Sequence, residues 1–286
     1  MTRYIPLLLL LPWPLALYGQ TAPAVPAAAD QALVERAFLN ELRAAQDTGH
    51  PMRYRLRKSS PRLTTTKELI ETQEGLVARL ILVNDEPLTD ADEKKEEERL
   101  DALLRDPGRQ HHRKQSEDDD SERALKVLRS LPKAFIYQPE GTDAGDGAPP
   151  SPIVKFTFRP NPAFDPPDLE TQVLTAMTGE LWIDRAQERV VRLEGHLQRD
   201  VDFGWGILGR LNKGGWIAIK QADVGEHQWR IAHFKMVMTG RVFFRSRVFD
   251  TEEQQSGFAP VPVGLTYQKA IEMLRAGDPS TSQGIH

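Results

Sequence analysis

The sequence predicts an α+β fold in which a large curved antiparallel sheet, a half-barrel of about 10 or 11 strands, is covered by helices. Three observations favour this class. Residues 178–250 alternate apolar and charged positions through at least four consecutive runs, which is the period of strands. Residues near the N-terminus and within 89–131 carry apolar side chains at helical spacing. Several strands are apolar on both faces, which a sheet with one face in water does not need.

The N-terminus has the features of a secretory signal peptide. Arg3 supplies a basic start, residues 4–18 are uncharged and mostly apolar, and small residues follow at Gly19, Ala22 and Ala24. The apolar run is shorter than the about 20 residues needed to span a bilayer. We therefore predict a signal peptide at residues 1–22, with cleavage after any of the three small residues and an uncleaved anchor as the alternative.

Composition limits what the rest of the chain can be. There is no cysteine, which excludes disulfides, thiolate metal sites and a lipid-modified cysteine. The net charge is −4, or about −5 without Arg3, and this argues against nucleic acid as a partner. Residues 23–286 are long enough for one large core. They are predicted to form a single domain, periplasmic or secreted, that does not span the membrane after cleavage and has a disordered tail at 277–286.

A helix and three strands are expected to open the domain. Asp30 is a suitable N-cap for a helix that runs to about residue 47, because Val34, Phe38 and Leu42 recur every four residues. The strands predicted after it cover residues 52–57, 63–72 and 76–83.

Residues 89–131 are predicted to be a charged helical insertion between strands. Glu, Lys, Arg and Asp dominate, and the content of apolar residues is too low for a separate core. We expect two helices joined by a polar loop at residues 107–121. The apolar residues at helical spacing are Leu100, Leu103, Leu104, Leu125, Leu128 and Leu131.

Most of the sheet is expected to follow this insertion. A short helix is predicted at residues 169–177 and a closing helix at 267–275, and Thr239-Gly240 is a candidate tight turn between the last two strands. The strands predicted in this part cover residues 134–137, 153–158, 179–184, 188–197, 215–221, 228–239 and 241–249.

The candidate catalytic and cofactor motifs are weak. Gly204, Gly206 and Gly209 fit the spacing of a dinucleotide-binding loop, but a strand follows where that loop needs a helix, so we interpret the glycines as a sharp bend. His111-His112 lies among three cations close to the acidic run 117–120, and we interpret it as a solvated loop and not a metal site. Motifs of metalloproteases, serine hydrolases and P-loop enzymes are absent. We therefore predict no catalytic residues, no metal and no cofactor.

The apolar residues on both faces of the late strands are the remaining signal. One face can pack on helices, and rolling the sheet would leave the other as the lining of a ligand cavity. Ordinary core packing is the alternative for each residue. Arg241, Arg245 and Arg247, expected on one strand, are candidates for a rim that meets anionic headgroups or for a solvated face. The predicted ligand-binding residues are Trp182, Trp216, Phe234, Met236, Met238 and Phe244.

One stretch resembles a known family. Gly179-Glu-Leu-Trp-Ile-Asp184, followed by Arg189-Val-Val-Arg-Leu-Glu194, is similar to the pattern of carrier-type proteins and of uncharacterised secreted bacterial proteins. With the helices and the signal peptide, it looks like the unclosed β-barrel of lipoprotein carriers over about the C-terminal 110 residues. The resemblance implies a concave apolar face beneath helices that binds acyl chains. The insertion at 89–131 departs from the family pattern, and no functional arginine of the family can be matched here.

Three functional hypotheses follow. The first is an exported non-enzymatic protein that holds a lipid or other amphipathic ligand in a half-barrel cavity. The second is an envelope protein–protein interaction or regulatory module with a filled core, which uses the charged insertion as its contact surface. The third and least favoured is an envelope hydrolase, which requires a cleft with convergent acids or histidines.

Overall fold

One antiparallel sheet of 13 strands organises the protein. The computed structural model describes residues 28–142, 152–203, 209–242 and 245–277. The predicted signal peptide and all of the predicted disordered tail except Gly277 lie outside these residues. The sheet is open, since its two end strands β4 and β5 are not paired with each other. Its strands in spatial order are β4 (Glu86–Pro87), β3 (Gly75–Val83), β2 (Thr64–Thr72), β1 (Met52–Ser59), β13 (Arg245–Pro260), β12 (Trp229–Val242), β11 (Trp216–Asp223), β8 (Arg189–Leu197), β7 (Met177–Asp184), β6 (Ile153–Pro160) and β5 (Phe135–Thr142).

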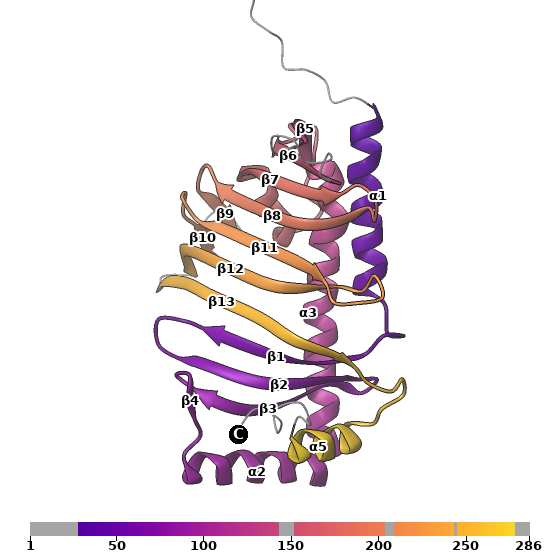
Figure 1. Ribbon diagram of the computed structural model, residues 1–286. Helices are drawn as coiled ribbons and strands as arrows, with labels where there is room; N and C mark the ends of the chain where they lie inside the picture. Colours follow the sequence, from indigo (N-terminus) through magenta and orange to yellow (C-terminus); the bar gives the residue numbers. More distant parts are fainter. Residues whose placement is uncertain (1–27, 143–151, 204–208, 243–244, 278–286) are drawn as a thin grey trace, which may run out of the picture.

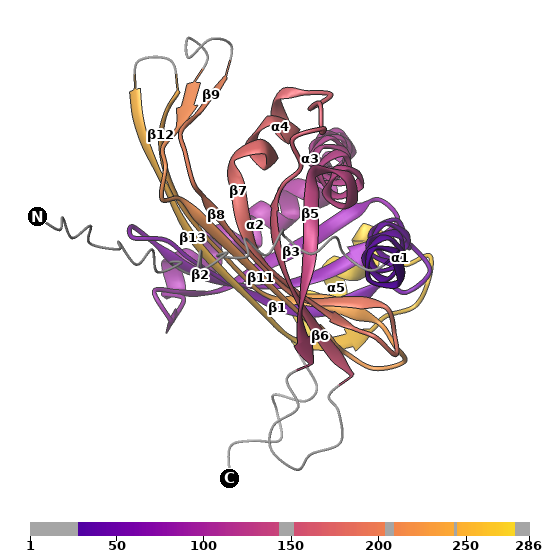
Figure 2. The same ribbon diagram turned by 90° about the horizontal axis from the view of Figure 1, so that it is seen from above.

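A small hairpin extends this sheet at one end of its strands. It consists of β9 (Val201–Phe203) and β10 (Gly209–Leu211), and β10 also pairs with the end of β12. Figure 2 shows this hairpin and the end of β12 projecting together, away from the helices.

Helices cover different parts of the sheet on its two faces. Figure 1 shows α3 running behind the sheet for most of its height, with α2 and α5 at the lower end. We call the face that α1 and α3 cover the inner face and the opposite one the outer face. The helices in the described chain are α1 (Ala28–Ala45), α2 (Asp90–Arg105), α3 (Pro107–Ala134), α4 (Leu169–Gln172), the 3-10 helix η1 (Val173–Ala176) and α5 (Tyr267–Ala276).

The largest core lies between the inner face of β5–β8 and helices α1, α3 and η1. Leu33, Val34, Ala37 and Phe38 of α1 bury one stripe of that helix, as the four-residue recurrence predicts. The helix begins at Ala28, so Asp30 lies in its first turn and is not its N-cap. A carboxylate there still stabilises the positive end of the helix dipole.

A second core lies at the other end of the sheet, on the outer face of β2 and β3. Ile70 and Val77 are fully buried against Ala270, Ile271 and Leu274 of α5. Leu100 and Leu103 of α2 complete this cluster. The segment 89–131 is therefore not an addition to a finished domain, because its leucines fill the second core and those of α3 pack against the first.

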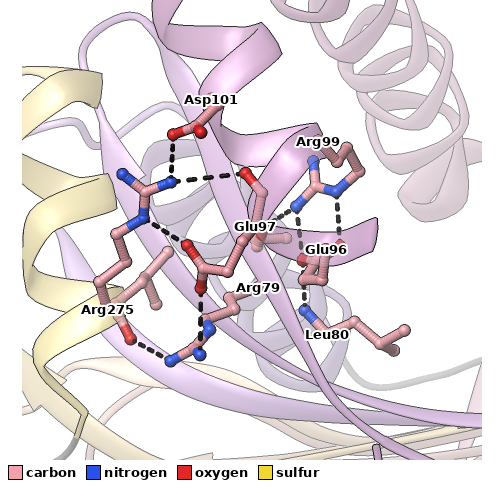
Figure 3. A network of polar contacts seen from close by, with 9 residues as sticks. Arg79, Leu80, Glu96, Glu97, Arg99, Asp101 and Arg275 are labelled. Atoms are coloured by element: carbon pink, nitrogen blue, oxygen red, sulfur yellow. Dashed lines mark hydrogen bonds and ion pairs between the residues drawn. The ribbon is translucent and has the colours of Figure 1, made fainter. Parts of the chain in front are cut away.

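β4 pairs only with the last two residues of β3, and side chains of α2 cover the free edge of the rest of this strand. The carboxylate of Glu96 accepts a hydrogen bond from the Leu80 amide at 2.7 Å, and Arg99 donates to the Ala78 carbonyl at 2.5 Å (Figure 3). Unpaired amides and carbonyls at a sheet edge invite pairing with another chain. The α2 side chains occupy the groups that a further strand would use.

The predicted polar loop at 107–121 is wrong, because α3 is helical throughout this range. Asp106 caps it by accepting from the Gly108 amide at 3.1 Å, and Pro107 occupies the first turn, where its missing N–H costs nothing. Oppositely charged pairs four residues apart then stabilise the helix, such as Lys114 with Asp118 at 2.8 Å. The many charged residues of this segment led to the prediction of a loop, but they lie on a helix that is exposed to solvent.

The predicted turn at Thr239-Gly240 is also wrong. Both residues lie within β12, where Gly240 pairs with Arg247 of β13 and with Leu211 of β10. A Cβ at Gly240 would lie 2.3 Å from the carbonyl oxygen of Arg210. Glycine therefore allows the close approach of β10, and it does not form a turn.

Candidate functional site

The inner face carries a group of apolar side chains that the helices do not fully cover. In antiparallel strands, directly opposed residues share a face, and Ile217 pairs with Met236 while Ile219 pairs with Phe234. Both pairs lie on the same face as Leu181, which pairs with Leu193, the partner of Ile219. We call the following set the inner patch: Leu56, Ile217, Ile219, Ile231, Phe234 and Met236.

Burial changes sharply along this face. On β6 and β7 its apolar residues are closed off from solvent, with Phe156, Leu181 and Ile183 at 0% exposure. None of the inner-patch residues reaches that class, and Ile231 is 38% exposed. The apolar alternation thus continues past the point where the helix cover ends.

Helix α3 connects the two ends of the sheet. Near its start, Arg113 donates to the Leu76 carbonyl of β3 at 2.9 Å, and near its end Leu128 and Leu131 pack on the first core. Its middle must therefore cross the strands between β3 and β5, which include those of the inner patch. Residues 118–124 are all exposed, so the described protein leaves these two turns largely uncovered.

The predicted ligand-binding residues are divided between the two faces. Phe234 and Met236 belong to the inner patch, and Met238 lies beside them at 9% exposure as part of the first core. Trp182 and Trp216 are on the outer face, because Trp216 pairs with Val237 and alternates with Ile217. Phe244 lies outside the described residues.

Away from the second core, the outer face is charged and in contact with solvent. One row of mostly charged or polar side chains crosses the strands of this face, each residue directly opposite the next: Arg57, Gln254, His233, Lys220, Arg192, Trp182 and Lys155. A parallel row contains Glu252, Glu194 and Glu180, which form ion pairs with His233, Arg192 and Lys155.

The two tryptophans fit into this charged surface through cation–π contacts. Lys155 Nζ and the Arg192 guanidinium lie 5.4 Å and 4.7 Å from the Trp182 ring, and Lys235 Nζ lies 5.8 Å from that of Trp216. The hydrogen bonds that Lys155 donates to the carboxylates of Glu140 and Glu180 also raise the pKa of Lys155. Sequence reasoning took these tryptophans as evidence for a second apolar face, but their long cationic neighbours shield them in a wet one.

A buried polar clamp holds α1 against the sheet. Glu41 accepts from Arg189 at 2.8 Å and 3.1 Å, from the Val190 amide at 2.9 Å and from the Gln221 side chain at 2.9 Å. The buried carboxylate of Glu41 thus receives hydrogen bonds from protein donors in place of water. This arrangement fixes the helix and leaves no free group for chemistry.

Two polar pockets lie away from the inner patch. One, of about 710 Å³, is lined by Arg43, Asp47, Gln187, Arg189 and His227 beside the end of α1. The other, of about 490 Å³, is on the outer face between β12 and β3, with Arg55, Arg57, Thr66 and His233 in its wall. In both, the cations have acidic or amide neighbours, and no arrangement of nucleophile and base is formed by the lining residues.

The weak motifs of the sequence contribute no site in the described chain. His111 and His112 lie on the exposed side of α3, with ring centroids 6.4 Å apart, so the loop predicted for them is helical. No group of three or more metal-ligating side chains is assembled among the described residues. Of the three glycines of the dinucleotide-like motif, only Gly209 is described, and it begins β10 and no helix.

No family of known proteins, no curated protein and no solved structure matches the chain. Among the helices of the described residues, none has the length and apolarity required to cross a membrane.

Proposed function

We propose that this chain is an exported, non-enzymatic binding protein that holds a lipid or other amphipathic ligand against the inner patch. The sheet acts as a half-barrel in the manner of the lipoprotein carriers, and α3 passes over the bound ligand. The protein works in the periplasm or is secreted.

The observation that carries this proposal is the change of burial along one face of the sheet. The same alternation that is fully buried on β6 and β7 continues over β11 and β12 with partly exposed apolar side chains. Beyond them β13 presents Glu253 and Gln255 to the inner face, and Leu56 of β1 lies on the far side of these two residues. Each Å² of apolar surface that stays in contact with water forgoes about 25 cal/mol of the free energy that its burial would contribute. A ligand with an apolar chain would remove that surface from water.

Polar groups at the margin of the patch suit the headgroup of an amphipathic ligand. Lys58 and Lys67 lie on the inner face at the strands next to the patch, and both are exposed. Lys58 forms an ion pair with Glu253 at 2.7 Å. Two cations and one carboxylate leave one positive charge to meet an anionic or zwitterionic headgroup.

The test begins with the protein as a cell makes it. The chain is exported to a bacterial periplasm, purified without detergent, and examined by native mass spectrometry followed by solvent extraction. A stoichiometric lipid is the expected result. An empty protein that also fails to bind added palmitate would overturn the proposal and favour the interaction module instead.

A matched pair of variants locates the site. Ile231→Glu places a charge in the patch, and we expect it to weaken palmitate binding at least about tenfold, because burying one such side chain contributes about 1.5–3 kcal/mol. Val263→Glu changes an apolar residue that is 64% exposed in a loop away from the patch and should leave binding unchanged. Equal effects of both variants would contradict a site at the inner patch, and their melting temperatures show whether each is folded.

A further inference from the structure

The distal end of the β12–β13 hairpin differs from the rest of the sheet in its exposure. Residues 245–249 of β13 are all exposed, so the described protein covers the side chains on neither of their faces fully. Val248 is 71% exposed and Phe249 39%. Figure 2 shows this end of the sheet projecting beyond the helices, together with the β9–β10 hairpin.

The same end of the molecule is basic although the chain as a whole is acidic. Segments 199–213 and 237–250 contain six basic residues and three acidic ones, against a net charge of −4 for the chain. Two of the acids, Asp200 and Asp202, contact Arg210 of β10. Arg245 and Arg247 are exposed and have no hydrogen-bond or ion-pair partner among the described residues.

Apolar and basic side chains alternate on this ribbon. Arg245, Arg247 and Phe249 point to the inner side, since they pair with alternate residues of β12, and Val248 points to the outer side. A projecting element with exposed apolar side chains among arginines fits the interface of an anionic bilayer, where the arginines meet lipid headgroups and the apolar groups enter the region below them. Nucleic acid fits less well, because a phosphate backbone offers no apolar region for Val248 and Phe249 to enter.

We propose that the distal β12–β13 ribbon docks the protein on membrane surfaces rich in anionic lipid. This contact is peripheral and reversible, since two arginines and two apolar side chains provide a modest affinity. It does not depend on the inner patch, because the docking residues lie at the projecting end and not among the patch residues.

Vesicle sedimentation tests the proposal. The full chain is mixed with vesicles of phosphatidylglycerol and phosphatidylcholine in equal parts, and with vesicles of phosphatidylcholine alone. We expect binding to the first and little to the second, with a steep decrease as sodium chloride rises. The double variant R245Q/R247Q should bind the anionic vesicles about 30-fold more weakly, since each arginine near such a surface contributes about a factor of five.

A control variant removes the same charge elsewhere. Arg129 and Lys133 are exposed on α3, and R129Q/K133Q should bind vesicles as the unmodified chain does. Equal loss in both double variants, or equal binding of the unmodified chain to both kinds of vesicle, would overturn the proposal. So would tighter binding of a single-stranded RNA oligonucleotide at the same salt. Palmitate binding measured on R245Q/R247Q separates the two proposals, since failure of vesicle binding leaves ligand retention unaffected.

Discussion

Glu252 shows how single residues keep the outer face of the sheet charged. Its carboxylate accepts from His233 at 2.9 Å and pairs with Lys235 at 3.2 Å. Hydrogen bonds from His233, Lys235 and Gln254 lower the pKa of Glu252 to about 2 from its usual 4.5. The folded state therefore favours the ionised form.

This shift makes a pH-dependent contribution to stability. A lowered pKa in the folded state stabilises the protein fully above pH 4.5, and the contribution disappears as the pH falls toward about 2. Because the side chain is 29% exposed, solvent screening limits the effect to about 1 kcal/mol. Glu252→Gln should lower the free energy of unfolding by this amount at pH 7 and by nothing near pH 2, as measured by urea unfolding. Glu226→Gln, at an exposed turn position, serves as a control, and a pH-independent difference would contradict the assignment.

At the scale of elements, side chains of α2 cover the free backbone edge of β3. The Glu96 side chain is 8% exposed and has both Arg99 and the Leu80 amide as donors. Glu96→Ala leaves that amide without a partner and the guanidinium without its anion, and we expect a loss of about 2 kcal/mol in unfolding free energy. Faster hydrogen exchange at Leu80 and concentration-dependent association through the freed edge should accompany it.

The neighbouring residue Glu98 supplies the control for this edge. Glu98→Ala changes an exposed glutamate of the same helix and should alter neither exchange at Leu80 nor the sedimentation coefficient. If Glu96→Ala causes no association and no faster hydrogen exchange at the Leu80 amide, then α2 does not prevent pairing of the β3 edge with another chain.

Strands and helices with a clear apolar periodicity were predicted correctly. Strands that form only because they pair with a neighbouring strand were not. The large antiparallel sheet with helices and the range of β3 follow from apolar alternation and turn residues. The second half of β13 was missed, because Thr251-Glu-Glu-Gln-Gln255 has no apolar alternation and is a strand through its pairing with β1. The short strands β4 and β10 likewise exist as partners of the longer strands β3 and β12, and β9 pairs with β10.

At the scale of the whole molecule, apolar alternation within a strand does not tell which side of that strand faces the helices. Phe234, Met236 and Met238 share one face, but Trp182 and Trp216 lie on the other. Only the cross-strand register shows this, since a shift by one residue would exchange the two faces. The half-barrel with a ligand remains a prediction that the ligand experiments above address.

The two cores at opposite ends of the sheet imply that the domain depends on the segment between them. Deleting residues 89–131 removes Leu100 and Leu103 from the second core and Leu128 and Leu131 from the first, and it uncovers the edge of β3. We therefore expect the deleted chain to aggregate or to lose its cooperative thermal transition, as followed by circular dichroism and size-exclusion chromatography. Asp119→Asn, on the exposed middle of α3, should melt as the unmodified chain does. A monomeric deletion variant with an intact transition would show that the segment is dispensable, and it would restore the view of residues 89–131 as an insertion whose surface serves a partner.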